Sequence, residues 1–340
     1  MPRKYVKDDL LNIIGGKRGV PPILAPVALD AVAAADAGVS YRDYSNDGDA
    51  AFYVWDKCIE TYDLDAALIF IDDFFEYEPL GVELTDERDI PKAARRYIRP
   101  SVEWLMSARA PSFDENRFPM RSGLVHKLKQ KWGDNLLVGV SVAAPFTGVS
   151  LLCGIQETML LVYDDEELLR QTIDFTTRLS VACAKYLALN GADVIWYGDC
   201  AASSGFIGKD VYDAFAFGPA KDAVSQIKET GVTVIYHAGE NRTDALVKMA
   251  EIGADVLSCG EGCDMAALGE KTGCCLTGNV DPIGVLLNGR PETIESAVYD
   301  LRIKMRSRGK FIANTAEGIA VSTPRGNIAA LFNALRREHI

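Results

Sequence analysis

One histidine lies among acidic residues at the ends of predicted strands, and this combination could bind a metal ion. His237 ends the apolar run Val232 to His237 and is followed by Gly239 and Glu240. Glu317 follows the last apolar run of the chain in a similar way. Imidazole nitrogen and carboxylate oxygen are both ligands of Zn2+, and a catalytic zinc site keeps one coordination position open. His237 and Glu317 are therefore the first candidates for metal ligands.

Short apolar runs recur along the chain and predict eight buried β-strands. Their apolar residues are nearly continuous, as expected of parallel strands that are covered on both faces. Amphipathic helices are predicted between them, and one begins at the acidic residues 164–167, which suit the N-terminal end of a helix dipole. The predicted strands are Pro22 to Val27, Ala66 to Asp72, Leu136 to Ala144, Ala192 to Gly198, Val232 to His237, Ala254 to Ser258, Cys274 to Gly278 and Lys310 to Asn314.

This alternation of strands and helices predicts an α/β fold, a (β/α)8 TIM barrel with extra helices in the N-terminal half. The interval from Glu76 to Asn135 is too long for one connection, so a helical insertion is expected around 76–135. A doubly wound open sheet is the alternative, but the glycine-rich phosphate-binding motifs typical of that fold are missing. No linker rich in Pro, Gly or Ser divides the chain, and residues 1–340 are therefore predicted to form one domain.

Polar residues follow most of the predicted strands, and in a barrel these positions meet at the face that carries the active site. So many carboxylates in one cleft would repel each other unless a cation or a cationic substrate shares the site. Glu240 and Glu261 compete for a third ligand position, with Cys259 behind them. The predicted catalytic residues are Asp199, Asn279 and Asp281. The alternative for Asp199, Asp281 and Glu240 is capping of the following helices, with substrate hydrogen bonding also open to the two aspartates.

The remaining histidines and the cysteines carry weaker signals. His126 lies in the insertion and His339 in the C-terminal tail, so both are expected on the surface. The eight cysteines form no CxxC pair, and in a reducing compartment most are expected to be small, buried apolar residues.

Composition excludes several function classes. The formal net charge of -12 over 340 residues opposes binding to nucleic acid and to anionic membrane surfaces. An apolar fraction of 48% and a charged fraction of 25% are typical of a globular protein. The apolar runs are shorter than the roughly 20 residues that a membrane-spanning helix needs. The first ten residues are charged and lack a signal-peptide core, so a cytoplasmic protein is expected.

The chain resembles the uroporphyrinogen decarboxylase superfamily over nearly its whole length. The residues that carry the resemblance are Gly278-Asn279-Val280-Asp281-Pro282, Gly318-Ile319, Thr323-Pro324, Asn327-Ile328 and the segment Leu64 to Asp72. The resemblance implies a (β/α)8 barrel with one of two activities. One branch of the superfamily is the metal-free decarboxylase. The other comprises cobalamin-dependent methyltransferases, which bind zinc through a His-x-Cys pair after strand five and a Cys after strand eight.

The sequence departs from both branches at defined positions. His237 matches the zinc-binding histidine, but Gly239 and Glu317 stand at the two cysteine positions, so the thiolates implied there are missing. The decarboxylase pattern is also incomplete, because the first strand contains no Arg and Glu317 replaces the histidine after the last strand. Asp72 alone matches the aspartate that contacts the tetrapyrrole in that branch.

A ligand set of His and carboxylate is harder than one with thiolates and makes the metal a stronger Lewis acid toward oxygen. We therefore predict a zinc-dependent methyltransferase like the first methyltransferase of O-demethylase systems. It would move a methyl group from an oxygen-linked donor, such as a methoxylated aromatic or methanol, to the Co(I) of the cobalamin in a partner corrinoid protein. The predicted substrate-binding residues are Asp72, Phe146, Tyr197 and Phe206. The alternatives are a metal-free decarboxylase, a methylcobamide:thiol methyltransferase and a binding protein without catalysis.

Overall fold

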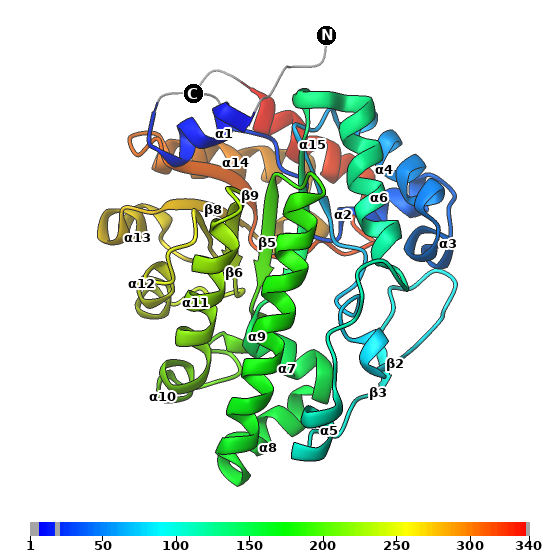
Figure 1. The fold of residues 1–340 in the computed structure, drawn as a ribbon. Coiled ribbons are helices and arrows are strands. Elements are labelled where there is room, and N and C mark those ends of the chain that lie inside the picture. Colours follow the sequence, from blue (N-terminus) through cyan, green and yellow to red (C-terminus); the bar gives the residue numbers. More distant parts are fainter. Residues whose placement is uncertain (1–6, 18–20, 338–340) are drawn as a thin grey trace.

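A curled sheet of seven parallel strands forms the centre of the protein (Figure 1). The computed structural model describes residues 7–17 and 21–337. The strand order is β1-β4-β5-β6-β7-β8-β9, so each strand pairs with the next strand of the central sheet along the chain. The strands are β1 (Ala66–Ile69), β4 (Leu137–Ala143), β5 (Val194–Gly198), β6 (Thr233–His237), β7 (Val256–Ser258), β8 (Cys275–Val280) and β9 (Phe311–Thr315). Seven of the eight predicted strands are confirmed.

The predicted first strand, Pro22 to Val27, is wrong as a strand and forms a single parallel β-bridge, Leu24 with Ala66. Proline has no N–H donor, and Pro22 and Pro26 interrupt the ladder that this segment could otherwise form. The Ala25 N–H still donates to the Ala66 carbonyl, 3.1 Å away. The segment therefore lies along β1 as an extended chain.

Helices follow the strands and cover the outer face of the sheet, in the strand-helix alternation that the sequence predicts (Figure 1). The helices are α1 (Lys7–Ile14), α2 (Leu29–Asp36), α3 (Tyr41–Asn46), α4 (Gly48–Tyr62), α5 (Val102–Ser107), α6 (Phe118–Trp132), α7 (Pro145–Cys153), α8 (Ile155–Asp164), α9 (Glu166–Leu189), α10 (Lys209–Val211), α11 (Phe217–Lys228), α12 (Thr243–Ala250), α13 (Met265–Thr272), α14 (Pro291–Met305) and α15 (Arg325–Arg336). Short 3-10 helices are η1 (Glu78–Leu80), η2 (Gly133–Asn135) and η3 (Cys200–Ala202), and π-helical turns are η4 (Tyr212–Ala216) and η5 (Pro282–Leu287). The acidic start of α9 matches its prediction, because Asp165 accepts a hydrogen bond from the Leu168 N–H.

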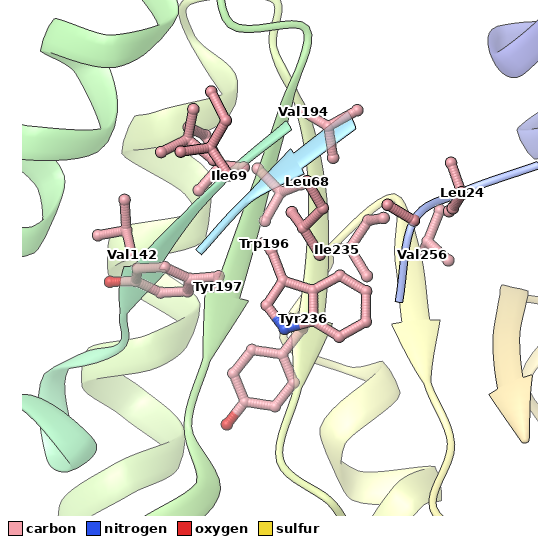
Figure 2. Packing of buried hydrophobic residues seen from close by; sticks show 14 of the residues in the cluster. Leu24, Leu68, Ile69, Val142, Val194, Trp196, Tyr197, Ile235, Tyr236 and Val256 are labelled. Carbon is pink, nitrogen blue, oxygen red and sulfur yellow. The ribbon is translucent and has the colours of Figure 1, made fainter. Parts of the chain in front are cut away.

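Side chains of the strands alternate between the two faces of the sheet. Trp196 and Ile235 are register partners in β5 and β6 and lie on the inner face near Leu24, whereas Val142 and Tyr197 lie together on the other side of the ribbon (Figure 2). This alternation follows from the period of two residues along a strand. The alternation decides which side chains of each strand face the interior of the curled sheet and which face the helices outside it.

The stretch 76–135 contains α5 and α6, as the predicted insertion requires, and also a small antiparallel pair that the sequence did not reveal. The pair is β2 (Glu83–Leu84) with β3 (Ala94–Arg96). The buried side chain of Arg121 on α6 forms an ion pair of 2.6 Å with Glu76 at the start of this stretch, and it also donates to the Ser141 carbonyl of β4. The Cys183 thiol on α9 also donates to Glu76, at 2.9 Å.

Among the described residues, no single helix has the length and hydropathy of a membrane span. The adjacent helices α7 and α8 reach such values only when they are taken together, and the chain bends by 109° between them.

We expect Glu76→Leu to destabilise the protein by about 3 to 5 kcal/mol, because it leaves the buried Arg121 guanidinium without a counter-charge. Urea unfolding would measure this change. The double variant Glu76→Leu/Arg121→Met should recover most of the loss. Glu83→Ala is the control: its ion pair with Arg96 joins side chains that are 54% and 72% exposed, and its loss should cost less than about 1 kcal/mol. A cost for Glu76→Leu as small as that of the control would contradict the prediction.

Candidate active site

Three potential metal ligands meet beyond the C-terminal ends of the strands. The ligand atoms of Cys200, His237 and Glu317 all lie within 4.8 Å of one another. His237 is the last residue of β6, Cys200 follows β5 and Glu317 follows β9. Thiolate, imidazole and carboxylate together are donors suited to a divalent transition metal such as zinc. The residues present therefore fit the metal that the sequence predicts.

His237 is positioned by the register of the sheet. It pairs with Gly198 of β5, and its ring lies 5.0 Å from the inward-facing Trp196 ring. The side chain is buried, and its Nδ1 lies 3.0 Å from the Ser258 hydroxyl of β7. This contact leaves Nε2 directed at Glu317, whose Oε2 is 3.2 Å away.

The electrostatics of the cluster favour positive charge at His237. Burial lowers the pKa of His237, but hydrogen bonds and charge interactions with Cys200 and Glu317 outweigh burial and raise it to about 10. Burial raises the pKa of Glu317, but the hydrogen bond and charge of His237 and the hydrogen bond from the Gly318 N–H together outweigh burial, so the net shift is downward. A divalent cation would meet the same two acidic neighbours, and it would compete with the proton for the imidazole nitrogen.

Cys200 is the site residue that the sequence analysis missed. It belongs to the cysteines expected to be buried and apolar, an expectation that holds for most of them, but Cys200 is exposed. Asp199 fixes the backbone before it: its N–H donates to the His237 carbonyl at 2.6 Å, and its carboxylate accepts from the Tyr236 hydroxyl. The signal available in the sequence was that Cys200 lies two residues after the predicted strand Ala192 to Gly198.

Asp199 itself is fully buried at the end of β5, although we predicted a catalytic role for it. Burial raises its pKa to about 6, against hydrogen bonds from Tyr236 and Thr147 that lower it. The Thr147 hydroxyl also accepts from the Ala201 N–H. The structure therefore gives Asp199 a positioning role next to Cys200 and places its carboxylate away from solvent.

Glu240 and Glu261, two predicted ligands, lie outside the cluster of three. Glu240 is buried, and its carboxylate accepts from the N–H and hydroxyl of Ser204 and from the N–H groups of Asn241 and Arg242. This carboxylate joins the loops after β5 and β6, and it does not cap α12, whose N-cap residue is Arg242. Glu261 is exposed beside Asp281, whose carboxylate raises the pKa of Glu261.

Two further predicted residues also hold loops at the strand ends. The Asn279 side chain donates to the carbonyls of Gly260 and Cys263, each at 3.0 Å. Asp281 accepts from the N–H groups of Ile283 and Gly284 and so begins η5. Cys259, the reserve ligand candidate, is fully buried. The structure thus gives these side chains local partners rather than bringing them to the cluster.

Of the four predicted substrate-binding residues, three are buried and one is exposed. Phe146 and Tyr197 are fully buried. Tyr197 lies on the outer face of β5, and its hydroxyl therefore forms a hydrogen bond with the Ser180 hydroxyl of α9. Asp72 is buried and paired with Arg117 at 2.6 Å. Phe206, in the loop after η3, is 59% exposed and remains available to a ligand.

Asp73 and His126 lie outside the cluster of three ligands. Asp73, next to the buried and paired Asp72, is exposed. His126 is exposed as expected, and His339 lies outside the described residues.

Comparison with known proteins was made for the sequence and for the fold. The family model described as uroporphyrinogen decarboxylase (URO-D) matches residues 7–338. A methylcobamide:CoM methyltransferase MtbA of Methanosarcina mazei is 28% identical over 75% of this chain and 74% of that protein. A uroporphyrinogen decarboxylase of Solibacter usitatus is also 28% identical, over 82% of this chain and 81% of that protein.

Relatives that span more of the chain have a similar level of identity. A methylated-thiol--coenzyme M methyltransferase of Methanosarcina mazei is 26% identical over 97% of this chain and 89% of that protein. A solved structure of a methyltransferase from Methanosarcina mazei superimposes with a TM-score of 0.86, at 21% identity, over 97% of this chain and 98% of that one. This agreement shows that the fold is shared. Because the family model spans almost all of the sequence, the chain belongs to the uroporphyrinogen decarboxylase (URO-D) family.

Proposed function

We propose that this protein is a metal-dependent methyltransferase that moves a methyl group from an oxygen atom of a small donor to the Co(I) of a corrinoid in a partner protein. The observation that carries the proposal is the meeting of Cys200, His237 and Glu317 at the strand ends. Membership of a family whose relatives include corrinoid-linked methyltransferases supports it. Zn2+ is the proposed ion, since it accepts sulfur, nitrogen and oxygen donors.

In the proposed reaction, the bond between the methyl carbon and the donor oxygen breaks. The electron pair of Co(I) forms the new cobalt–carbon bond, and the pair of the broken bond leaves with the oxygen as an alkoxide or phenolate. A bound metal ion would supply Lewis acidity toward that oxygen. Cys200, His237 and Glu317 would hold the ion, with a position left for the donor.

The residues around the cluster orient it. Ser258 fixes the His237 ring through Nδ1, and the Trp196 ring packs against it. A partner at the second nitrogen sets the tautomer and direction of a ligating histidine. Phe206 is an exposed ring in the loop that follows Cys200, where a methoxylated aromatic donor could stack.

An oxygen donor is proposed because carboxylate and glycine stand where the resembling methyltransferases have cysteines, at Glu317 and Gly239. A carboxylate keeps the ion harder than a second thiolate would. A methylated thiol is the competing donor, because two relatives from Methanosarcina mazei are named for coenzyme M or methylated-thiol reactions. Decarboxylation has less support, since Asp72, the residue matched to a tetrapyrrole contact, is already paired with Arg117.

We expect the zinc-loaded protein to methylate free cob(I)alamin, used in place of the partner, from at least one of a panel of methoxylated aromatics and methanol. The loss of Co(I) absorbance would measure the reaction. His237→Ala should lower the rate by about 100-fold or more because the ion loses a ligand. His126→Ala, which changes an exposed histidine in the insertion, should retain the rate. Methylation from methylated thiols alone would contradict the proposed donor class, and decarboxylation of uroporphyrinogen without methyl transfer would contradict the whole proposal.

We expect Ser258→Ala to weaken zinc binding by about 10- to 100-fold, because the His237 ring loses the partner that orients it. Competition with a chromophoric chelator would measure the affinity. Ser180→Ala is the matched control: this serine is equally buried and also bonds a ring substituent, but its partner is Tyr197 on the outer face. Equal affinities for the two variants would show that Ser258 does not act through His237.

A further inference from the structure

Gly239 and Glu317 compete for one small volume beside His237. Gly239 lies two residues after His237 and has a φ of +64°. A Cβ atom built on Gly239 would lie 2.2 Å from Glu317 Oε1 and 3.3 Å from its carboxyl carbon. Nonbonded atoms do not approach to 2.2 Å, so a side chain at residue 239 and the observed position of the Glu317 carboxylate exclude each other. The absence of a side chain at Gly239 admits the carboxylate.

A thiol reaches the same place from another strand. The ladder between β5 and β6 pairs Gly198 with His237, and the Asp199 N–H donates to the His237 carbonyl. Cys200 therefore starts immediately beside the last residue of β6. Its sulfur approaches the imidazole from the β5 side, whereas residue 239 would approach along the loop after β6.

We propose that this chain uses a relocated thiolate as a metal ligand: Cys200 supplies the sulfur, and Gly239 determines the ligand set by leaving room for Glu317. The inference rests on the proposed function only for the presence of a metal ion. It adds why the donors are one sulfur, one nitrogen and one oxygen: the missing side chain at Gly239 admits the Glu317 carboxylate, and the sulfur comes from the β5 side. Two of these ligands are anionic, so they match the charge of a divalent ion while providing only one soft thiolate.

This arrangement gives a reason for the joint occurrence of Gly239, Glu317 and Cys200. A cysteine at residue 239 would place its Cβ against the Glu317 carboxylate and displace it. With glycine there, the longer glutamate side chain reaches the imidazole from the β9 side, at 3.2 Å. The sulfur then has to come from a third segment, and Cys200 is the thiol of the observed cluster.

Cobalt substitution tests the sulfur ligand without any measurement of activity. We expect the Co2+-loaded protein to show near-ultraviolet thiolate-to-cobalt charge-transfer absorption, and Cys200→Ser to lose this absorption and bind Co2+ about 10-fold or more weakly. Cys274→Ser is the control, since Cys274 is also partly accessible but lies at the start of β8, away from the cluster. Charge-transfer absorption that persists in Cys200→Ser would overturn the relocated ligand and leave the proposed function intact. A wild-type protein that binds no Co2+ or Zn2+ would overturn both.

A second pair of variants tests the role of Gly239. Gly239→Ala should weaken Co2+ binding by about 10-fold or more, because its Cβ displaces a ligand. Alanine at a positive φ also strains the backbone, so Gly231→Ala is the matched control: Gly231 has a φ of +75°, and its added Cβ would meet nothing within 4 Å. Unfolding by urea would measure the strain in both. Equal Co2+ affinity in the two variants would overturn the role of Gly239.

Discussion

The parallel ladder between β5 and β6 is the constraint on which the candidate site depends. It aligns Gly198 with His237 and lets the Asp199 N–H bond the His237 carbonyl, so the ends of both strands meet at one point. A shift of this register by one residue would turn every side chain of β6 to the opposite face. His237 would then face the outer helices, and Cys200 would have no imidazole beside it. The packing of Trp196 and Ile235 on the inner face stabilises the observed register.

Acidic side chains around the strand ends have two different kinds of partner. Asp72 and Glu76 are neutralised by Arg117 and Arg121, so these ion pairs connect the insertion to the end of β1. In each pair, the opposite charge and the hydrogen bonds offset the free energy that the two groups lose when they leave water. At the cluster, by contrast, Glu317 has the His237 imidazole as its partner, and a metal ion could take the place of the proton there. Asp72 and Glu76 therefore stabilise the fold, whereas the Glu317 carboxylate remains available to bind a metal ion.

Several acidic and amide side chains at the strand ends hold loops, and this explains why a ring of polar residues need not be a ring of ligands. Glu240 joins two loops through four hydrogen bonds, and Asn279 joins the segment after β7 to β8. A loop whose backbone is satisfied in this way stays in one conformation. The precise approach of Cys200 and Glu317 to His237 requires loops that do not move independently.

The sequence by itself determined the strand order and the position of most strands, and it placed His237 and Glu317 at the ends of two of them. Those features are local: a continuous apolar run indicates a buried strand, and a polar residue at its end indicates the face where the chemistry lies. The prediction of a first strand at Pro22 to Val27 was wrong, because its apolar run outweighed two prolines that cannot donate to a ladder.

Only the tertiary structure decided which polar residues meet. Glu317 was expected near His237, because both follow strands of the predicted barrel, but nothing in the local sequence distinguished Cys200 as the thiol that joins them. The same holds for residues whose roles changed: Tyr197 faces outward because of its phase in β5, and Asp72 is occupied by an arginine from a distant helix. Proximity in a parallel sheet follows from register and loop conformation, which depend on the packing of the whole chain.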